Sequence, residues 1–217
     1  MAACQALEAD LVWSPLLVPL PVSAADVAGE RWQARLSGVP LDGHYDPRLF
    51  VFASACLLTR ELAARVGPWR PARETFVSSS QDWLWRAWQT GARMRVMPGV
   101  TVMAIPGSMR SDSYSESDSA EHNCYAARMH ADPHFRETML ALAARAGERA
   151  ANRVRFGHEW FGATAGLLFR LASAAAMRFG THPFVPYFAL RHGRRGNLIG
   201  AIRCRSGLGG LPPPRRA

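Results

Sequence analysis

The stretch SSSQDWLWRAWQTGARMRVMP, residues 78–98, joins a serine-capped helix to a strand-like segment. A serine at its start can cap the helix and the glycine that follows can end it, so the pattern predicts a helix over Ser80–Thr90. Asp82 lies in the first turn, where unpaired backbone N–H groups and the helix dipole favour negative charge. On local grounds, Asp82 is therefore interpreted as a structural acid at a helix start.

Apolar segments on both sides of this helix predict a small sheet. They are Leu11–Leu20, bounded by prolines; Leu49–Leu58, a strand or a short helix; and the short strands Arg93–Pro98 and Thr101–Ile105 around a Pro-Gly turn. We expect Leu11–Leu20, Leu49–Leu58 and Thr101–Ile105 to share one mixed sheet, with the Ser80 helix packed nearby. The sequence therefore predicts an α/β fold.

Two segments between these strands carry helix and turn signals. Thr59 is a predicted N-cap, and Gly67 ends a helix whose last residue is Val66. Glu30–Leu41 is polar and is typical of a loop or a helix. Ala2–Ala9 has the pattern of the end of a helix.

The C-terminal half is predicted to be helical after a serine-rich loop. Gly107–Ser119 has too few apolar residues to form a core and is interpreted as a surface loop, either a linker or a lid. We expect a mobile lid over the start of the Asp82 helix. Helical periodicity follows over Pro133–Arg149 and, as an amphipathic helix, over Glu159–Arg178. Prolines then separate this helix from the basic tail Arg191–Arg205.

Composition indicates a globular protein with an uneven charge. Of 217 residues, 48% are apolar and 20% are charged. All 26 basic side chains counted as Lys or Arg are arginine, and the net charge is +9. From Trp160 to the last residue there are nine arginines and no acid. The positive charge is therefore concentrated in the C-terminal segment.

Cysteine spacing and hydropathy bear on location. Four scattered cysteines without a Cys-x-x-Cys pair indicate neither a zinc ribbon nor a disulfide framework, and they favour a reducing compartment. No apolar run reaches the roughly 18–20 residues of a spanning helix, and no signal-type N-terminus is evident. We expect a cytoplasmic protein, peripheral on the inner face of the plasma membrane.

Three stretches together resemble the C-terminal, acceptor-side half of a bacterial family 2 glycosyltransferase of GT-A fold. They are ASACLLTRELAARVGPWRP at Ala53–Pro71, SSQDWLWRAWQTGARMRVMPGVTVMAI at Ser79–Ile105, and RFGTHPFVPYFALRHGRRGNLI at Arg178–Ile199. The resemblance implies a partial GT-A mixed sheet with flanking helices over residues 1–130. It also implies a helical, basic extension over residues 131–217.

The same resemblance assigns roles near the helix start. In the family, the second acid of a Glu-Asp doublet is the general base that takes a proton from the acceptor hydroxyl, and Asp82 matches that position. Gln81 stands where the family usually has Glu. With Gln81, the substrate-binding candidates are Trp83, as a wall of the site, and Arg86, which reaches Asp82 or a phosphate; simple ion pairing is the favoured role of Arg86. Trp88 is expected to face the core.

The nucleotide-binding half of such an enzyme is not recognisable in this sequence. The resemblance implies that this half carries a divalent metal, Mn or Mg, on an Asp-x-Asp element that follows a buried strand, and no such element is found. We expect a truncated gene, a wrongly assigned start codon or a split enzyme. Since some GT-A enzymes supply a histidine to the metal from the region after the acceptor helix, His122 is the metal-ligand candidate.

Two classes of function remain open at this point. The first is inverting transfer of a sugar from a nucleotide-sugar donor to a carbohydrate or lipid-linked acceptor, as the resemblance implies. The second is a non-catalytic remnant or a membrane-surface interaction module. The basic tail lacks a nucleic-acid recognition motif and suits an anionic membrane surface better, with ordinary solvated charge as the alternative.

Overall fold

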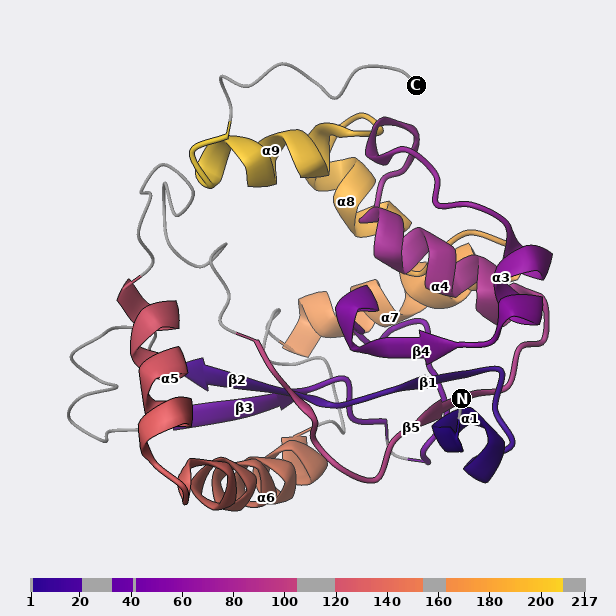
Figure 1. The fold of residues 1–217 in the computed structure, drawn as a ribbon. Helices are drawn as coiled ribbons and strands as arrows, with labels where there is room; N and C mark the ends of the chain where they lie inside the picture. Colours follow the sequence, from indigo (N-terminus) through magenta and orange to yellow (C-terminus); the bar gives the residue numbers. More distant parts are fainter. Residues whose placement is uncertain (1, 21–32, 41, 105–119, 154–162, 209–217) are drawn as a thin grey trace.

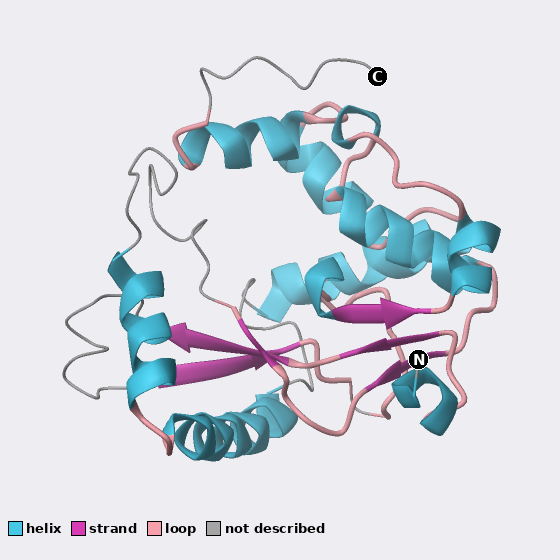
Figure 2. Cartoon of the chain, in the orientation of Figure 1, coloured by secondary structure: helices cyan, strands magenta, loops and turns pink. Residues whose placement is uncertain are grey.

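The structure, a computed structural model, describes residues 2–20, 33–40, 42–104, 120–153 and 163–208 (Figure 1). The chain is a mixed α/β protein with two small sheets and helices around them (Figure 2). The predicted serine lid, Gly107–Ser119, lies outside the described residues.

The first sheet has the order β4-β1-β5. Strand β1 (Leu11–Trp13) is central, with β4 (Cys56–Leu58) antiparallel to it and β5 (Met94–Val96) parallel to it. Leu11 is opposite Leu58 on one side and Met94 on the other.

The second sheet repeats this mixed arrangement in the order β3-β2-β6. Strand β2 (Leu16–Leu20) is central, with β3 (Gln33–Ser37) antiparallel and β6 (Val102–Met103) parallel. The two sheets lie next to each other because β1 and β2 are consecutive pieces of one extended stretch (Figure 1).

Three sequence expectations are corrected here. Leu11–Leu20 is two strands in two sheets, because Pro15 has no N–H to donate and the chain breaks at Ser14–Pro15. Leu49–Leu58 forms only a short 3-10 helix, η1 (Ala53–Ala55), and then β4, so it shares no sheet with Val102–Met103. Glu30–Leu41, which was expected to be a loop or a helix, contains β3.

Helices α3 (Arg60–Val66) and α4 (Ser79–Gln89) cover one face of the first sheet. Leu11, Trp13, Leu62, Leu84 and Met94 form a buried cluster there. Because side chains alternate across a strand, Val12 lies on the other face and packs against the cluster around α1 (Ala2–Ala6). The first sheet therefore has a buried layer on each side.

The second sheet is covered by α5 (Ala120–Ala131) and α6 (Phe135–Arg153). Leu17 packs with Tyr125, Phe135, Met139 and Ala143 in one cluster. The helix predicted from Pro133 is thus confirmed as α6 within a few residues. The apolar side of α6 packs against the second sheet, so the sheet and the segment after residue 130 share one hydrophobic core.

The remaining helices are α7 (Ala163–Arg178), α8 (Val185–His192) and α9 (Asn197–Arg205). The helix predicted over Glu159–Arg178 is present as α7 and ends at Arg178, before Pro183, as expected. Pro186 does not interrupt a helix, because it lies in the first turn of α8, where its missing N–H costs no helical hydrogen bond. The helices contact α4 and the 3-10 helix η2 (Ala72–Glu74). Within the described residues, no helix has the length and apolar character needed to cross a membrane.

Candidate functional site

The candidate site is built by α3, α4 and the loop between them. Thr59 caps α3, its Oγ1 accepting a hydrogen bond from the Leu62 N–H at 3.2 Å, and Gly67 ends the helix at φ +77°, as predicted. Helix α4 begins one residue earlier than predicted, because Ser78 is the cap and its Oγ accepts from the Gln81 N–H. The cap of α4 therefore needs no contribution from Asp82.

Asp82 lies in the first turn of α4 and is only 8% exposed. Its Oδ2 accepts a hydrogen bond from Arg86 Nε at 3.1 Å, and its Oδ1 lies 3.4 Å from Arg70 Nη1. The two arginines differ in environment, since the Arg86 side chain is 17% exposed and the Arg70 side chain 56%. One carboxylate oxygen is thus firmly anchored, while the other has a longer contact with a solvent-exposed side chain.

Arg86 holds the α3–α4 loop as well as Asp82. Its two terminal nitrogens donate hydrogen bonds to the backbone carbonyls of Val66 and Pro68, both at 2.7 Å. The three nitrogens of the planar guanidinium each serve a different acceptor, whereas a lysine carries all its donors on one nitrogen atom. The ion pairing expected of Arg86 is present, and it fixes both the carboxylate and the loop.

Gln81 and Trp83 point into the protein interior. Gln81 is buried, donates from Nε2 to the Val51 carbonyl at 2.8 Å, and leaves its Oε1 without a hydrogen-bond partner. Trp83 is buried, donates from Nε1 to the Gly67 carbonyl at 2.8 Å, and stacks on Trp69 with ring centroids 5.2 Å apart. Both side chains therefore fix the first turn of α4 through hydrogen bonds to backbone carbonyls in the interior.

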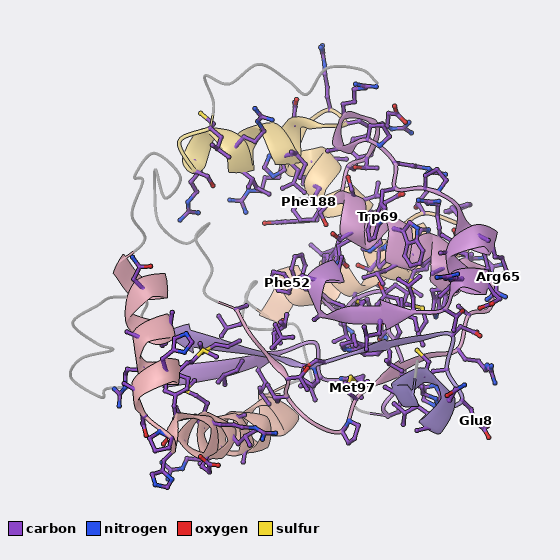
Figure 3. The ribbon with its side chains drawn as sticks, viewed as in Figure 1. Glu8, Phe52, Arg65, Trp69, Met97 and Phe188 are labelled. Carbon is purple, nitrogen blue, oxygen red and sulfur yellow. The ribbon has the colours of Figure 1, made fainter. Side chains whose placement is uncertain are left out.

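Trp69 and Arg70 are the site residues that sequence reasoning missed. Trp69 is an exposed aromatic ring beside α4 (Figure 3), and Arg70 is the second cation near Asp82. Both follow the helix stop Gly67-Pro68 in a loop without periodicity. The only available signal was their position inside the stretch that resembles the glycosyltransferase segment.

The other tryptophans of α4 differ from expectation. Trp88, expected to face the core, is exposed and stacks on Trp85, with ring centroids 5.0 Å apart. Trp85 is buried and meets the edge of His182, 5.9 Å away. Because Trp85 faces the C-terminal helices, α4 is buried on two sides, a pattern that a single amphipathic stripe does not predict.

Among its described side chains, the site shows no set of ligands for a divalent metal. His122 lies in α5, and its side chain is outside the part of the chain that the structure describes. Among the described side chains, no group of three or more His, Cys, Asp or Glu comes together. Asp82 is neutralised by two guanidinium groups, which disfavour a cation at the same carboxylate.

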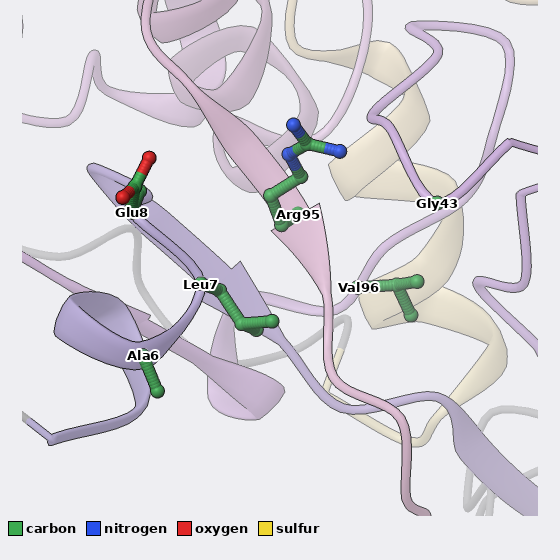
Figure 4. Close-up of a pocket in the computed structure, with 6 residues that line it drawn as sticks. All are labelled: Ala6, Leu7, Glu8, Gly43, Arg95 and Val96. Atoms are coloured by element: carbon green, nitrogen blue, oxygen red, sulfur yellow. The ribbon is translucent and has the colours of Figure 1, made fainter.

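A separate cavity of about 370 Å³ lies beside strand β5 of the first sheet (Figure 4). Its lining comes from the end of α1, the turn at Gly43 and strand β5, and includes Glu8 and Arg95. Arg95 Nη1 is 2.7 Å from His44 Nε2. No residue of α3 or α4 lines this cavity, so it is distinct from the Asp82 region.

Comparisons with protein-family models, curated proteins and solved structures return no match for this chain.

Proposed function

We propose that the chain is the acceptor-side part of an inverting, GT-A-type glycosyltransferase. The donor is a nucleotide-sugar and the acceptor a hydroxyl of a carbohydrate or a lipid-linked saccharide. The observation that supports the proposal best is the unequal binding of the Asp82 carboxylate, with Oδ2 held by Arg86 and Oδ1 next to the exposed Arg70. The resemblance of residues 53–105 to the family's acceptor segment supplies the reaction class.

In this proposal, Asp82 acts as the general base. The acceptor hydroxyl gives its proton to Oδ1, while its oxygen attacks the anomeric carbon from the side opposite the leaving group. The bond from that carbon to the diphosphate oxygen breaks, its electron pair leaves with the nucleotide, and the configuration inverts. Arg86 keeps the carboxylate in a fixed orientation, and Trp69 offers an exposed ring on which a sugar can stack.

A non-catalytic role is the second candidate, and a specific observation favours it. Both carboxylate oxygens of Asp82 have arginine partners, and Arg86 also binds the carbonyls of Val66 and Pro68. A network of this kind is also sufficient for a purely structural role, in which it fastens α4 to the α3–α4 loop. In that case, the chain is a remnant or an interaction module, and its Asp82 never meets an acceptor.

The test compares transfer and stability in Asp82→Asn. Sugar transfer from a panel of labelled nucleotide-sugars to membrane extracts is measured with the chain alone and with a donor-binding half supplied in the same reading frame or in trans. We expect Asp82→Asn to reduce transfer by roughly 10²–10⁴-fold. It should also lower the free energy of unfolding by about 1–3 kcal/mol, because Arg86 loses a charged partner.

Asp46→Asn is the matched control, since Asp46 binds Arg48 in a turn on the surface and lies outside α3 and α4. This variant should transfer sugar at the parental rate. If Asp82→Asn transfers as fast as the parent while losing stability, Asp82 is a structural acid and the second candidate is correct. If the parent transfers no sugar under any condition, the enzymatic proposal is wrong for this chain.

A further inference from the structure

Helix α7 presents three leucines to solvent on one side. Leu167, Leu168 and Leu171 are 56%, 68% and 60% exposed, and we call them the leucine stripe. The opposite side of the helix is packed, because Ser173 and Ala176 are buried and Phe169 stacks on Phe184 with ring centroids 5.6 Å apart. The helix is therefore docked by one face, while an apolar face of the same helix has no cover in the described residues.

Positive charge accompanies the stripe. Arg178 lies seven residues after Leu171 and eleven after Leu167, which places it on the same side of the helix, and it is exposed. The whole segment from Trp160 to the end of the chain contains nine arginines and no aspartate or glutamate. An exposed apolar face is thus combined with an arginine-rich segment that contains no acidic residue.

We propose that the leucine stripe docks on an anionic lipid surface. Leucine side chains that point away from a docked helix can enter the boundary between head groups and acyl chains, while arginines on the same segment bind the anionic head groups. A second copy of this chain fits less well, since a symmetric pair would bring two acid-free, arginine-rich segments together. The proposal is independent of sugar transfer.

The experiment measures flotation of the purified chain with vesicles. One set contains phosphatidylcholine alone and the other equal parts of phosphatidylcholine and phosphatidylglycerol. We expect binding to the anionic vesicles, with the affinity falling as salt is added. Substituting serine at Leu167, Leu168 and Leu171 together should reduce the partition coefficient by more than about tenfold. Arg178→Gln should reduce it by about fivefold.

The matched control places serine at three exposed apolar positions on other elements, Leu57, Met129 and Leu140. All these changes remove solvent-exposed side chains, so circular dichroism and melting should remain close to the parent, and the control should bind vesicles like the parent.

Four outcomes overturn the proposal. They are equal binding to neutral and anionic vesicles, no binding to either, parental binding by the stripe variant, and an equal loss of binding in the control. Analytical ultracentrifugation provides the remaining test. A dimer that the stripe variant dissociates would assign the leucine stripe to a second copy of the chain and not to a membrane.

Discussion

The imidazole of His182 is a buried titratable group in an aromatic setting. Its Nδ1 accepts a hydrogen bond from the Phe184 N–H at 3.1 Å, and its Nε2 is buried without a partner. The rings of Trp85 and Phe184 lie against it. Burial lowers the pKa of His182 to about 3, well below the ordinary value of 6.5. The folded protein therefore holds this side chain in its neutral form.

We predict that His182 makes the protein less stable in mild acid. Between pH 6.5 and pH 3 the unfolded chain takes up a proton on His182 and the folded chain does not, so stability is present above pH 6.5 and is lost as the pH falls. The slope from this one group approaches about 1.4 kcal/mol per pH unit. Urea unfolding of the parent and of His182→Asn, at several values between pH 7 and pH 4.5, measures it.

Asparagine retains an acceptor oxygen close to the position of Nδ1 and removes the titration. We expect a shallower pH slope in His182→Asn, and a parental slope in His134→Asn, which alters an exposed histidine. Equal slopes in the parent and in His182→Asn would show that the acid sensitivity lies elsewhere.

At the candidate site, the sequence predicted the position of Asp82 but not its surroundings. The serines, the glycine stop and the i,i+4 arginine located the helix and its ion pair, because these signals are local. The surroundings include Arg70, which lies next to the Asp82 carboxylate, and Trp69, which stacks on Trp83; both come from the preceding loop. Because Asp82 is buried and paired with Arg86, we expect Asp82→Asn to cost more than the about 0.3–1 kcal/mol of an exposed acid at a helix start.

At the scale of elements, the two long parallel stretches of the chain are interrupted at the same position, between the first sheet and the second. Strand β1 ends just before Ser14, and its parallel partner β5 ends at Val96; β2 and its parallel partner β6 then begin beyond the break. Ser14 is buried, and its Oγ accepts a hydrogen bond from the Thr101 N–H at 2.8 Å across the break. The Ser14 hydroxyl therefore connects the β1–β2 stretch with the β5–β6 stretch at a position where the two are not paired as strands.

We predict that Ser14→Ala lowers the free energy of unfolding by about 1–2 kcal/mol, because the Thr101 N–H loses its acceptor. Chemical denaturation at neutral pH measures the change. Ser37→Ala is the matched control, since Ser37 Oγ makes only a long, exposed contact of 3.4 Å with the Phe50 carbonyl. If Ser14→Ala changes the free energy of unfolding by less than about 0.5 kcal/mol, this hydrogen bond does not stabilise the connection between the two sheets.

The elements that were predicted correctly are those with strong local signals. Helices α3, α4 and α6 have caps or clear periodicity, and the apolar run Leu11–Leu20 is extended as predicted, although it forms two strands, β1 and β2. Strand β3 was missed although QARLS alternates polar and apolar residues, because the run is short and contains no β-branched or aromatic residue; its place is set by pairing with β2. The division into two sheets was missed because the run contains two prolines, of which Pro15 lies at the break while Pro19 lies inside β2.

At the scale of the molecule, the C-terminal helices dock on the candidate-site region through backbone contacts. Gly196, which begins α9, donates its N–H to the Thr75 carbonyl at 2.9 Å and has φ +83°. A Cβ on Gly196 would lie 2.8 Å from Arg73 Cα, in η2. The close approach and the positive φ both require glycine at this position. Nearby, Arg195 lies over the Phe76 ring, 5.5 Å from its centroid.

We predict that Gly196→Ala detaches α9 from η2, whereas Gly193→Ala does not. Gly193 has a similar φ of +74° with open space around its Cβ position, so both variants carry the left-handed strain of about 1–2 kcal/mol. Only Gly196→Ala adds the backbone clash, for about 1–3 kcal/mol more. Limited trypsin digestion measures the detachment, because cleavage after Arg203 and Arg205 should be faster in Gly196→Ala than in Gly193→Ala. Equal cleavage rates in the two variants would contradict this account.

The parallel pairs β1–β5 and β2–β6 set the order in which this chain can fold. Leu11 is opposite Met94, 94 − 11 = 83 positions away, and Leu16 is opposite Val102, 102 − 16 = 86 positions away. Closing loops of this length requires an entropy loss before any sheet contact rewards it, so the helices can form well before either sheet is complete. During synthesis, β1 and β2 have to wait for more than eighty further residues to leave the ribosome. Until then, two apolar strands lack their parallel partners, and a chaperone that shields them would raise the yield of folded protein.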